Sequence, residues 1–410
     1  MIRKAAALAA LTCAIALPQV ASASSNLFFG FSDDSLKYEP AFAVPIARDI
    51  GAQAFRVTLL WSKGQTDLDP AQIANLDTVA GGAAGMRVVV ALYGKSNTDA
   101  PTDEASRTQY CTFARNLITR YPQVNDIVIW NETNKQFFWK PQYDRKGASA
   151  APAAYVALLA RCWEELHAYR PEVNLLAAAT SPRGNDRPNA RSNVSHSPGA
   201  FIRKMGKAFR ALNLNHRIFD TVAHHGYGPF SSERPWKRHS TTSGLISQGD
   251  YTALLTALQE AYEGTAQPLP GQCVESWCVG IWYTEMGIQT QVDRKKRRFY
   301  TGRESDPRAV PDDAGAPGWN SEGSVSDDSS APDQATQITD ALRHAYCLPF
   351  VDAFFNLQLW DEPDLGRWQS APLWADRTPK DSYAAFQQAI AAVNADTIDC
   401  AAVKWLRRGA

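Results

Sequence analysis

Two glutamates in this sequence directly follow apolar, strand-like runs, which is an unusual place for a carboxylate. Glu132 lies in the stretch VIWNETNKQ, and Glu285 lies in the stretch VGIWYTEMG. Two opposed carboxyl groups, one protonated and one ionised, are what the hydrolysis of a glycosidic bond requires. A single glutamate after a strand is more often a helix cap or an exposed charge. The pair is therefore a catalytic candidate only if the fold places the two side chains opposite each other.

A regular alternation of predicted strands and helices runs through the sequence. Apolar, β-rich runs predict strands at 27–31, 54–60, 87–92, 126–130, 173–179, 219–225, 279–284 and 351–359. Helical periodicity predicts helices at about 39–50, 70–84, 104–120, 152–170, 199–212, 250–263, 334–347 and 381–394. Most strands are nearly continuous apolar runs, as in a parallel sheet with both faces buried. We therefore expect one α/β domain, a (β/α)8 TIM barrel over residues 24–410, and not a doubly wound sheet with its Gly-rich first turn.

Working residues of such barrels gather at the C-terminal ends of the strands. Besides the two glutamates, these ends carry Arg56, Asn131, His225, Tyr227 and Trp360. Two of them also have an ordinary structural explanation, an internal ion pair for Arg56 and plain packing for Trp360.

Some neighbouring residues compete with these candidates. His224 adjoins His225, although strand alternation puts His225 and Tyr227 on one face. Asp361 and Glu362 follow the last strand and are more typical of loop structure.

The sequence is rich in aromatic residues, with 12 Trp, 14 Tyr and 17 Phe. Aromatic faces stack well on the apolar faces of sugars, although most aromatic residues belong to a protein core. Further sugar platforms, each more typical of a core position, are Trp61, Tyr93, Trp139, Trp282 and Trp368.

These residues together resemble clan A of the glycoside hydrolases, the retaining (β/α)8 enzymes that include families 5 and 39. The resemblance is carried by WNETN around Glu132, YTEMG around Glu285, Arg56 on the second strand, HGY after the sixth strand and Trp360 after the eighth. As architecture it covers the whole chain after the first 23 residues, and as motif only these positions. Thr133 stands where the family more often has proline, which alters the rigidity of the loop and removes no reacting group.

The resemblance implies a role for each matching residue. Glu132 would be the general acid/base and Glu285 the nucleophile of a double displacement, with carboxyl groups about 5–5.5 Å apart. Arg56 would keep Glu285 ionised, and Tyr227 would donate a hydrogen bond to it.

The sugar itself would be bound by three further residues. Asn131 would bind its 2-hydroxyl, His225 would line its subsite, and Trp360 would form the floor on which it stacks. No metal or organic cofactor is implied. Two alternatives stay open, a carbohydrate-binding barrel without turnover and a transglycosylase of the same fold.

The N-terminus has the pattern of a secretory signal peptide. Arg3 and Lys4 precede an apolar run at 5–17, and small residues at 21–23 form a cleavage pattern. We expect cleavage after residue 23 and an extracellular protein, the alternative being a buried N-terminal helix. No other run approaches the length that spans a membrane.

Six cysteines remain after residue 23, an even number that favours disulfides in an oxidising compartment. The candidates are Cys111, Cys162, Cys273, Cys278, Cys347 and Cys400. Cys273 and Cys278 are close enough to clip a loop, and the other four would pair as sequence neighbours. A zinc site is disfavoured because no second CxxC or clustered His pair is present.

Charge and one long polar segment complete the sequence picture. The 42 basic and 42 acidic residues cancel, which disfavours nucleic acid or an anionic membrane as a partner. Residues 291–333 are polar and rich in Pro and Gly, and we expect them to be an active-site loop, with a flexible linker as the alternative. The oligomeric state cannot be read from the sequence.

Overall fold

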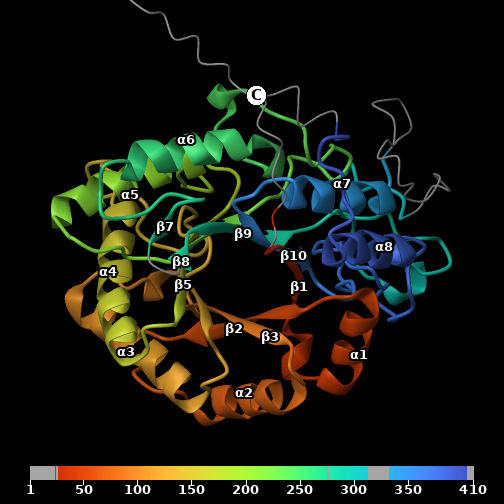
Figure 1. Ribbon diagram of the computed structural model, residues 1–410, viewed down its shortest axis with the longest axis horizontal. Helices are drawn as coiled ribbons and strands as arrows, with labels where there is room; N and C mark the ends of the chain where they lie inside the picture. Colours follow the sequence, from red (N-terminus) through yellow and green to blue (C-terminus); the bar gives the residue numbers. More distant parts are fainter. Residues whose placement is uncertain (1–23, 25, 275–276, 313–331, 404–410) are drawn as a thin grey trace, which may run out of the picture.

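The barrel predicted from the sequence is confirmed in the computed structural model, which describes residues 24, 26–274, 277–312 and 332–403 (Figure 1). Its eight parallel strands close in the order β1-β10-β9-β6-β5-β4-β3-β2. They are β1 Phe28–Ser32, β2 Ala54–Trp61, β3 Arg87–Gly94, β4 Asp126–Ile129, β5 Asn174–Thr180, β6 Thr221–His225, β9 Gly280–Met286 and β10 Val351–Leu357. All eight C-terminal strand ends therefore open on one face of the barrel.

Eight α-helices among the described residues form the outer ring in Figure 1. They are α1 Pro40–Ile50, α2 Pro70–Gly82, α3 Glu104–Arg120, α4 Ala151–Tyr169, α5 Pro198–Leu212, α6 Tyr251–Tyr262, α7 Gln334–Tyr346 and α8 Tyr383–Asn394. Local sequence sets their starts: Asp69 before α2 and Asp103 before α3 each form a capping box that satisfies free backbone N–H groups. Pro stands in the first turn of four of these helices, α1, α2, α4 and α5, where its missing N–H has no cost.

Two apolar layers hold the barrel together. Alternate residues of β3 separate cleanly, because Val88 and Val90 pack in the large cluster beneath the helices while Val89 and Ala91 join a smaller cluster made of strand residues. The smaller cluster fills the barrel interior, as expected for a TIM barrel. Trp282 also lies in this inner cluster, 3% exposed, and so belongs to the core.

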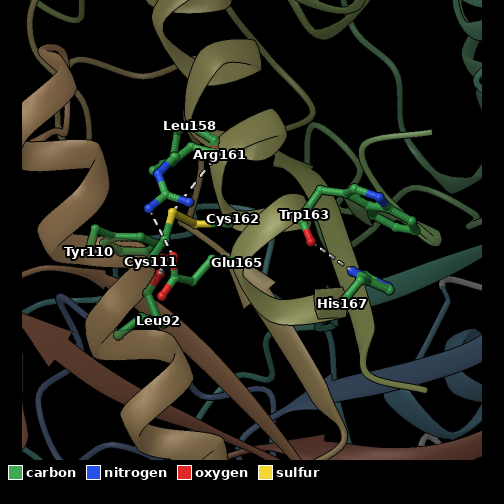
Figure 2. The surroundings of a disulfide bond; sticks show 9 residues. All are labelled: Leu92, Tyr110, Cys111, Leu158, Arg161, Cys162, Trp163, Glu165 and His167. Carbon is green, nitrogen blue, oxygen red and sulfur yellow. Dashed lines mark hydrogen bonds and ion pairs between the residues drawn. A yellow bond between two sulfur atoms is a disulfide. The ribbon is translucent and has the colours of Figure 1, made fainter. Parts of the chain in front are cut away.

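Three disulfides link the described cysteines. They are Cys111–Cys162, Cys273–Cys278 and Cys347–Cys400. Figure 2 shows the first of these joining α3 to α4, with the ion pair between Arg161 and Glu165 on the same stretch of α4. The pairing of sequence neighbours expected from the cysteine positions is confirmed.

Several element boundaries differ from the sequence prediction. A hairpin of β7 Cys273–Val274 and β8 Trp277–Cys278 was not predicted, because strands of two residues carry no periodicity. Strand β4 ends one residue early, since Trp130 has a φ of 70° and leaves the extended conformation. Strand β10 likewise ends at Leu357, before Gln358 with a φ of 68°.

The long polar segment is ordered where the structure describes it. Residues 291–312 include a 3-10 helix at Arg297–Phe299, and bridges join Thr290 to Val310 and Thr301 to Asp364. Residues 313–331 and the proposed signal peptide lie outside the described residues. Within the described part of the chain, no helix combines the length and apolar character that crossing a bilayer demands.

Candidate active site

The turn after β4 brings Glu132 to the mouth of the barrel. Trp130 and Glu132 both have positive φ values, 70° and 39°, which are uncommon for residues with a side chain. The turn is held in place because Trp130 is fully buried, its ring N–H donates to the carbonyl of Phe138 at 3.0 Å, and the Glu132 N–H donates to the carbonyl of Ala179 at 2.9 Å. Strained backbone of this kind persists only where the surroundings fix it, and it gathers at functional sites.

Glu132 and Glu285 face each other across the barrel mouth. His225 Nδ1 lies 3.0 Å from Glu132 Oε1 and 3.3 Å from Glu285 Oε2. The two carboxylate oxygens cannot be farther apart than the sum of these distances. This limit applies to the two facing oxygens, and it agrees with the separation of about 5–5.5 Å found when one carboxyl group is the nucleophile.

Arg56 connects the strand ends beneath the carboxylates. Its Nη1 donates to Glu285 Oε1 and to Ser32 Oγ, each at 2.8 Å, and its Nη2 donates to Asn131 Oδ1 at 2.7 Å. Arg56 is only 4% exposed, so its charge acts on Glu285 with little screening by water. The contact also orients the Asn131 amide, which leaves its Nδ2 as the group able to donate to a ligand.

The surroundings of Glu285 favour its ionised form. Burial of the carboxyl raises the pKa of Glu285, but the charges of His225 and Arg56 act in the opposite direction. Hydrogen bonds from Tyr227, at 3.1 Å, and from Arg56 also lower it. The pKa of Glu285 lies below its ordinary value as a result, which suits a nucleophile.

Two cavities meet at these residues, and both include Tyr93 and Glu285 in their walls. The larger cavity, about 870 Å³, is lined by Glu132, Asn131 and Tyr227 and also by Ser305, Asp306 and Pro307 of the long polar segment. The smaller cavity, about 420 Å³, is lined by Arg56 and Trp360. All seven sequence-predicted site residues therefore lie in or directly against these two cavities, with His225 buried behind the glutamates.

The structure also shows where His224 and the possible sugar platforms lie relative to the two cavities. His224 faces away from the glutamates, since its ring contacts Thr180 and the carbonyl of Ile246, and burial lowers the pKa of His224 to about 4. Of the possible sugar platforms, Tyr93 and Trp368 line the cavities. The others, Trp61, Trp139 and Trp282, are buried in the core.

Asp361 is a structural residue, as its place in a loop suggested. It is fully buried and pairs with Lys380, and the next residue, Glu362, lines the smaller cavity.

Several site residues were missed in the sequence. Ser32 ends β1 and holds Arg56, so its place at a strand end was the available signal. Lys135 and Phe137 both line the larger cavity just after Glu132, and Phe137 is 75% exposed, but their loop positions carry no such signal. Among the described residues, no group of three or more His, Cys, Asp or Glu could hold a metal ion.

Comparison with known proteins gives a likeness in structure alone. No family model matches the sequence, and no curated protein matches it. A family 39 glycoside hydrolase from Bacteroides cellulosilyticus WH2 has a TM-score of 0.54 at 15% identity, over 90% of this chain and 64% of that one. A monomeric beta-xylosidase from Caulobacter crescentus CB15 has a TM-score of 0.50 at 15% identity, over 88% of this chain and 67% of that one.

The chain shares their barrel fold. It spans about two thirds of the length of these solved structures. The resemblance to clan A barrels is thus confirmed as a likeness of fold, and the chemistry must be argued from the residues of this chain.

Proposed function

We propose that this protein is an exported retaining glycoside hydrolase that acts on a β-linked carbohydrate. One observation carries the proposal: oxygens of Glu132 and Glu285 approach the same nitrogen of His225, at 3.0 and 3.3 Å, and this closeness favours the short carboxyl separation of retaining enzymes, about 5–5.5 Å. The three disulfides support export, because disulfides persist in oxidising compartments.

The first half of the reaction forms a glycosyl-enzyme. The Glu285 carboxylate attacks the anomeric carbon while Glu132 gives its proton to the departing oxygen. The lowered pKa of Glu285 keeps this group ionised in weakly acidic solution. The Asn131 amide, held by Arg56, can donate to the 2-hydroxyl of the sugar, where a contact strengthens in the oxocarbenium-like transition state.

The second half of the reaction releases the sugar. Glu132, now ionised, takes a proton from water, and the resulting nucleophile attacks the anomeric carbon and displaces Glu285. Two inversions give net retention of configuration. Trp360, in the wall of the smaller cavity, can contact the sugar with the part of its ring that Phe42 and Arg377 leave open.

Product stereochemistry tests this proposal directly. The purified protein would be incubated with a panel of aryl β-glycosides and β-linked polysaccharides, and the anomeric proton of the first product followed by NMR before mutarotation. Initial release of the β-anomer is expected. Initial α-anomer would contradict the mechanism, transfer to sugar acceptors with no hydrolysis would make the protein a transglycosylase, and binding without any turnover would leave a carbohydrate-binding barrel.

The acidic limb of the pH profile should depend on Tyr227. Glu285 must be ionised to attack, so kcat/KM falls as the pH drops through its lowered pKa. Tyr227→Phe removes one hydrogen bond to the carboxylate, and the acidic limb should move up by about 0.5–1 pH unit. The check is kcat/KM against pH, with Tyr383→Phe on the outer helix α8 as the control. An acidic limb at the same pH in Tyr227→Phe and the wild type would refute this account of Glu285.

A further inference from the structure

The two cavities would bind different parts of a substrate. A general acid must face the oxygen of the leaving group, and a nucleophile must face the anomeric carbon. Glu132 lines the larger cavity, whereas Arg56 and Trp360 line the smaller one, and Glu285 stands where the two meet. Under the proposed function, the larger cavity therefore holds the leaving-group side of the substrate and the smaller cavity holds the glycone side.

The glycone side carries mostly paired charges. Its ionisable lining residues are Asp33, Asp34, Glu39, Arg56, Glu285, Asp361 and Glu362. The single cation among them, Arg56, is already engaged by Glu285 and Asn131. Three of its carboxylates are paired with cations just behind the wall, Asp34 with Lys37, Glu39 with Arg377 and Asp361 with Lys380, so the charges on this side are largely compensated.

The leaving-group side carries both carboxylates and cations. Lys135 and Arg183 both line the larger cavity, and no described carboxylate lies within ion-pair distance of either. Lys135 Nζ donates to the backbone carbonyl of Arg183 at 3.4 Å, and the ammonium group has two further N–H donors for a ligand.

The other charged residues of this wall are differently placed. Arg234 pairs with Asp340, and Glu233 pairs with Lys237 and His239. Asp306 accepts backbone N–H groups of Ser231 and Arg308. Among the cations of this wall, Lys135 and Arg183 are thus the two that have no carboxylate partner in the described structure.

A half-buried cation without a carboxylate carries a desolvation cost. Burial lowers the pKa of Lys135, against the attraction of the Glu132 charge. Arg183 is exposed at the cavity wall, and its charge opposes protonation of Lys135. An anion bound between the two side chains would offset both the burial of the Lys135 charge and its repulsion by Arg183. It would also form charge-assisted hydrogen bonds with them.

We infer that the leaving-group side of the substrate carries an anionic group, a carboxylate or sulfate on a sugar, bound by Lys135 and Arg183. This inference rests on the proposed function. It makes the substrate a glycan with an acidic unit on the leaving-group side of the cleaved bond.

Matched leaving groups test the inference. The substrates are 4-carboxyphenyl, 4-sulfonatophenyl and neutral 4-carbamoylphenyl glycosides of a neutral sugar that the protein hydrolyses. The measured quantity is the ratio of kcat/KM for each anionic glycoside to that for the neutral one. In Lys135→Met/Arg183→Met this ratio should fall about tenfold, the size of one charge-assisted hydrogen bond. Comparing the two proteins cancels the intrinsic difference between the leaving groups.

Controls keep the outcomes separate. Lys207→Met, which removes an exposed charge on the outer helix α5, should leave the ratio as it is in the wild type. In the wild type the ratio should also fall as ionic strength rises, which needs no variant. An unchanged ratio in the double variant, or a ratio indifferent to salt, overturns the inference. Hydrolysis of none of these glycosides would instead overturn the proposed function.

Discussion

Glu285→Ala should lower kcat by at least ~10⁴-fold, because no covalent intermediate can form without the nucleophile. Removing the carboxylate also opens space directly beneath the anomeric carbon, beside the cation of Arg56. Azide entering this space attacks from the same face as the lost carboxylate and restores one displacement. The rescued product is therefore the glycosyl azide of inverted, α configuration, which NMR identifies.

Glu132→Ala should give the complementary result. With a poor leaving group its loss is about 10²–10⁴-fold, the size of general acid–base assistance. With a 2,4-dinitrophenyl glycoside the first step needs no acid, so the glycosyl-enzyme forms and accumulates. Azide then attacks that intermediate and yields the β-glycosyl azide, because two displacements have occurred.

The two azide products assign the two roles independently of the loss of rate. Glu172→Ala, which truncates an exposed glutamate just after α4, is the matched control. It should retain activity, and azide should change neither its rate nor its product. If the two variants gave azides of the same configuration, or if either kept full activity, the assignment of Glu132 and Glu285 would be wrong.

The barrel was predictable because its signal is repeated along the chain. Most strands are apolar runs and the segments between them have helical periodicity, so an error at one boundary leaves the alternation intact. The strand-end positions then brought Glu132 and Glu285 together with Arg56, since all parallel strands end on one face.

Other parts of the site could not be read in this way. The positive φ of Trp130 that turns Glu132 into the mouth depends on tertiary contacts, because nothing in its side chain favours that conformation. The charges of the two cavities depend on which loop residues converge, as Lys135 does with Arg183 from a loop about fifty residues further along. The hydrophobic periodicity of a sequence does not indicate which distant loops contact each other.

One buried ion pair ties the long polar segment to the wall that carries Trp360. Lys380 Nζ donates to Asp361 Oδ1 at 2.9 Å and to Thr290 Oγ1 at 2.8 Å, and both members of the pair are 0% exposed. Tyr300, from the polar segment, donates its hydroxyl to Asp361 Oδ2 at 2.8 Å. Burial raises the pKa of Asp361, and Lys380 is the cation that opposes this effect.

Lys380→Met should lower the free energy of unfolding by about 3–5 kcal/mol, because it leaves the Asp361 carboxylate buried without its cation. Asp361 will then hold a proton more readily when folded than when unfolded. Protonation of Asp361 therefore stabilises the folded variant fully at a pH below the pKa that Asp361 has in the unfolded chain. This stabilisation is lost as the pH rises through the higher pKa that Asp361 has in the folded protein. The deficit of Lys380→Met should accordingly shrink in acid, as urea unfolding at several pH values would reveal.

The partly exposed pair of Lys296 and Asp376 provides the comparison that makes this prediction decisive. Lys296→Met should cost at most about 1 kcal/mol, because water can solvate the carboxylate that is left. Adding Asp361→Leu to Lys380→Met removes the unpaired charge and should recover part of the loss, since an apolar side chain needs no counterion. Equal costs for Lys380→Met and Lys296→Met, or a deficit that does not change with pH, would mean that Lys380 does not neutralise Asp361 in the folded protein.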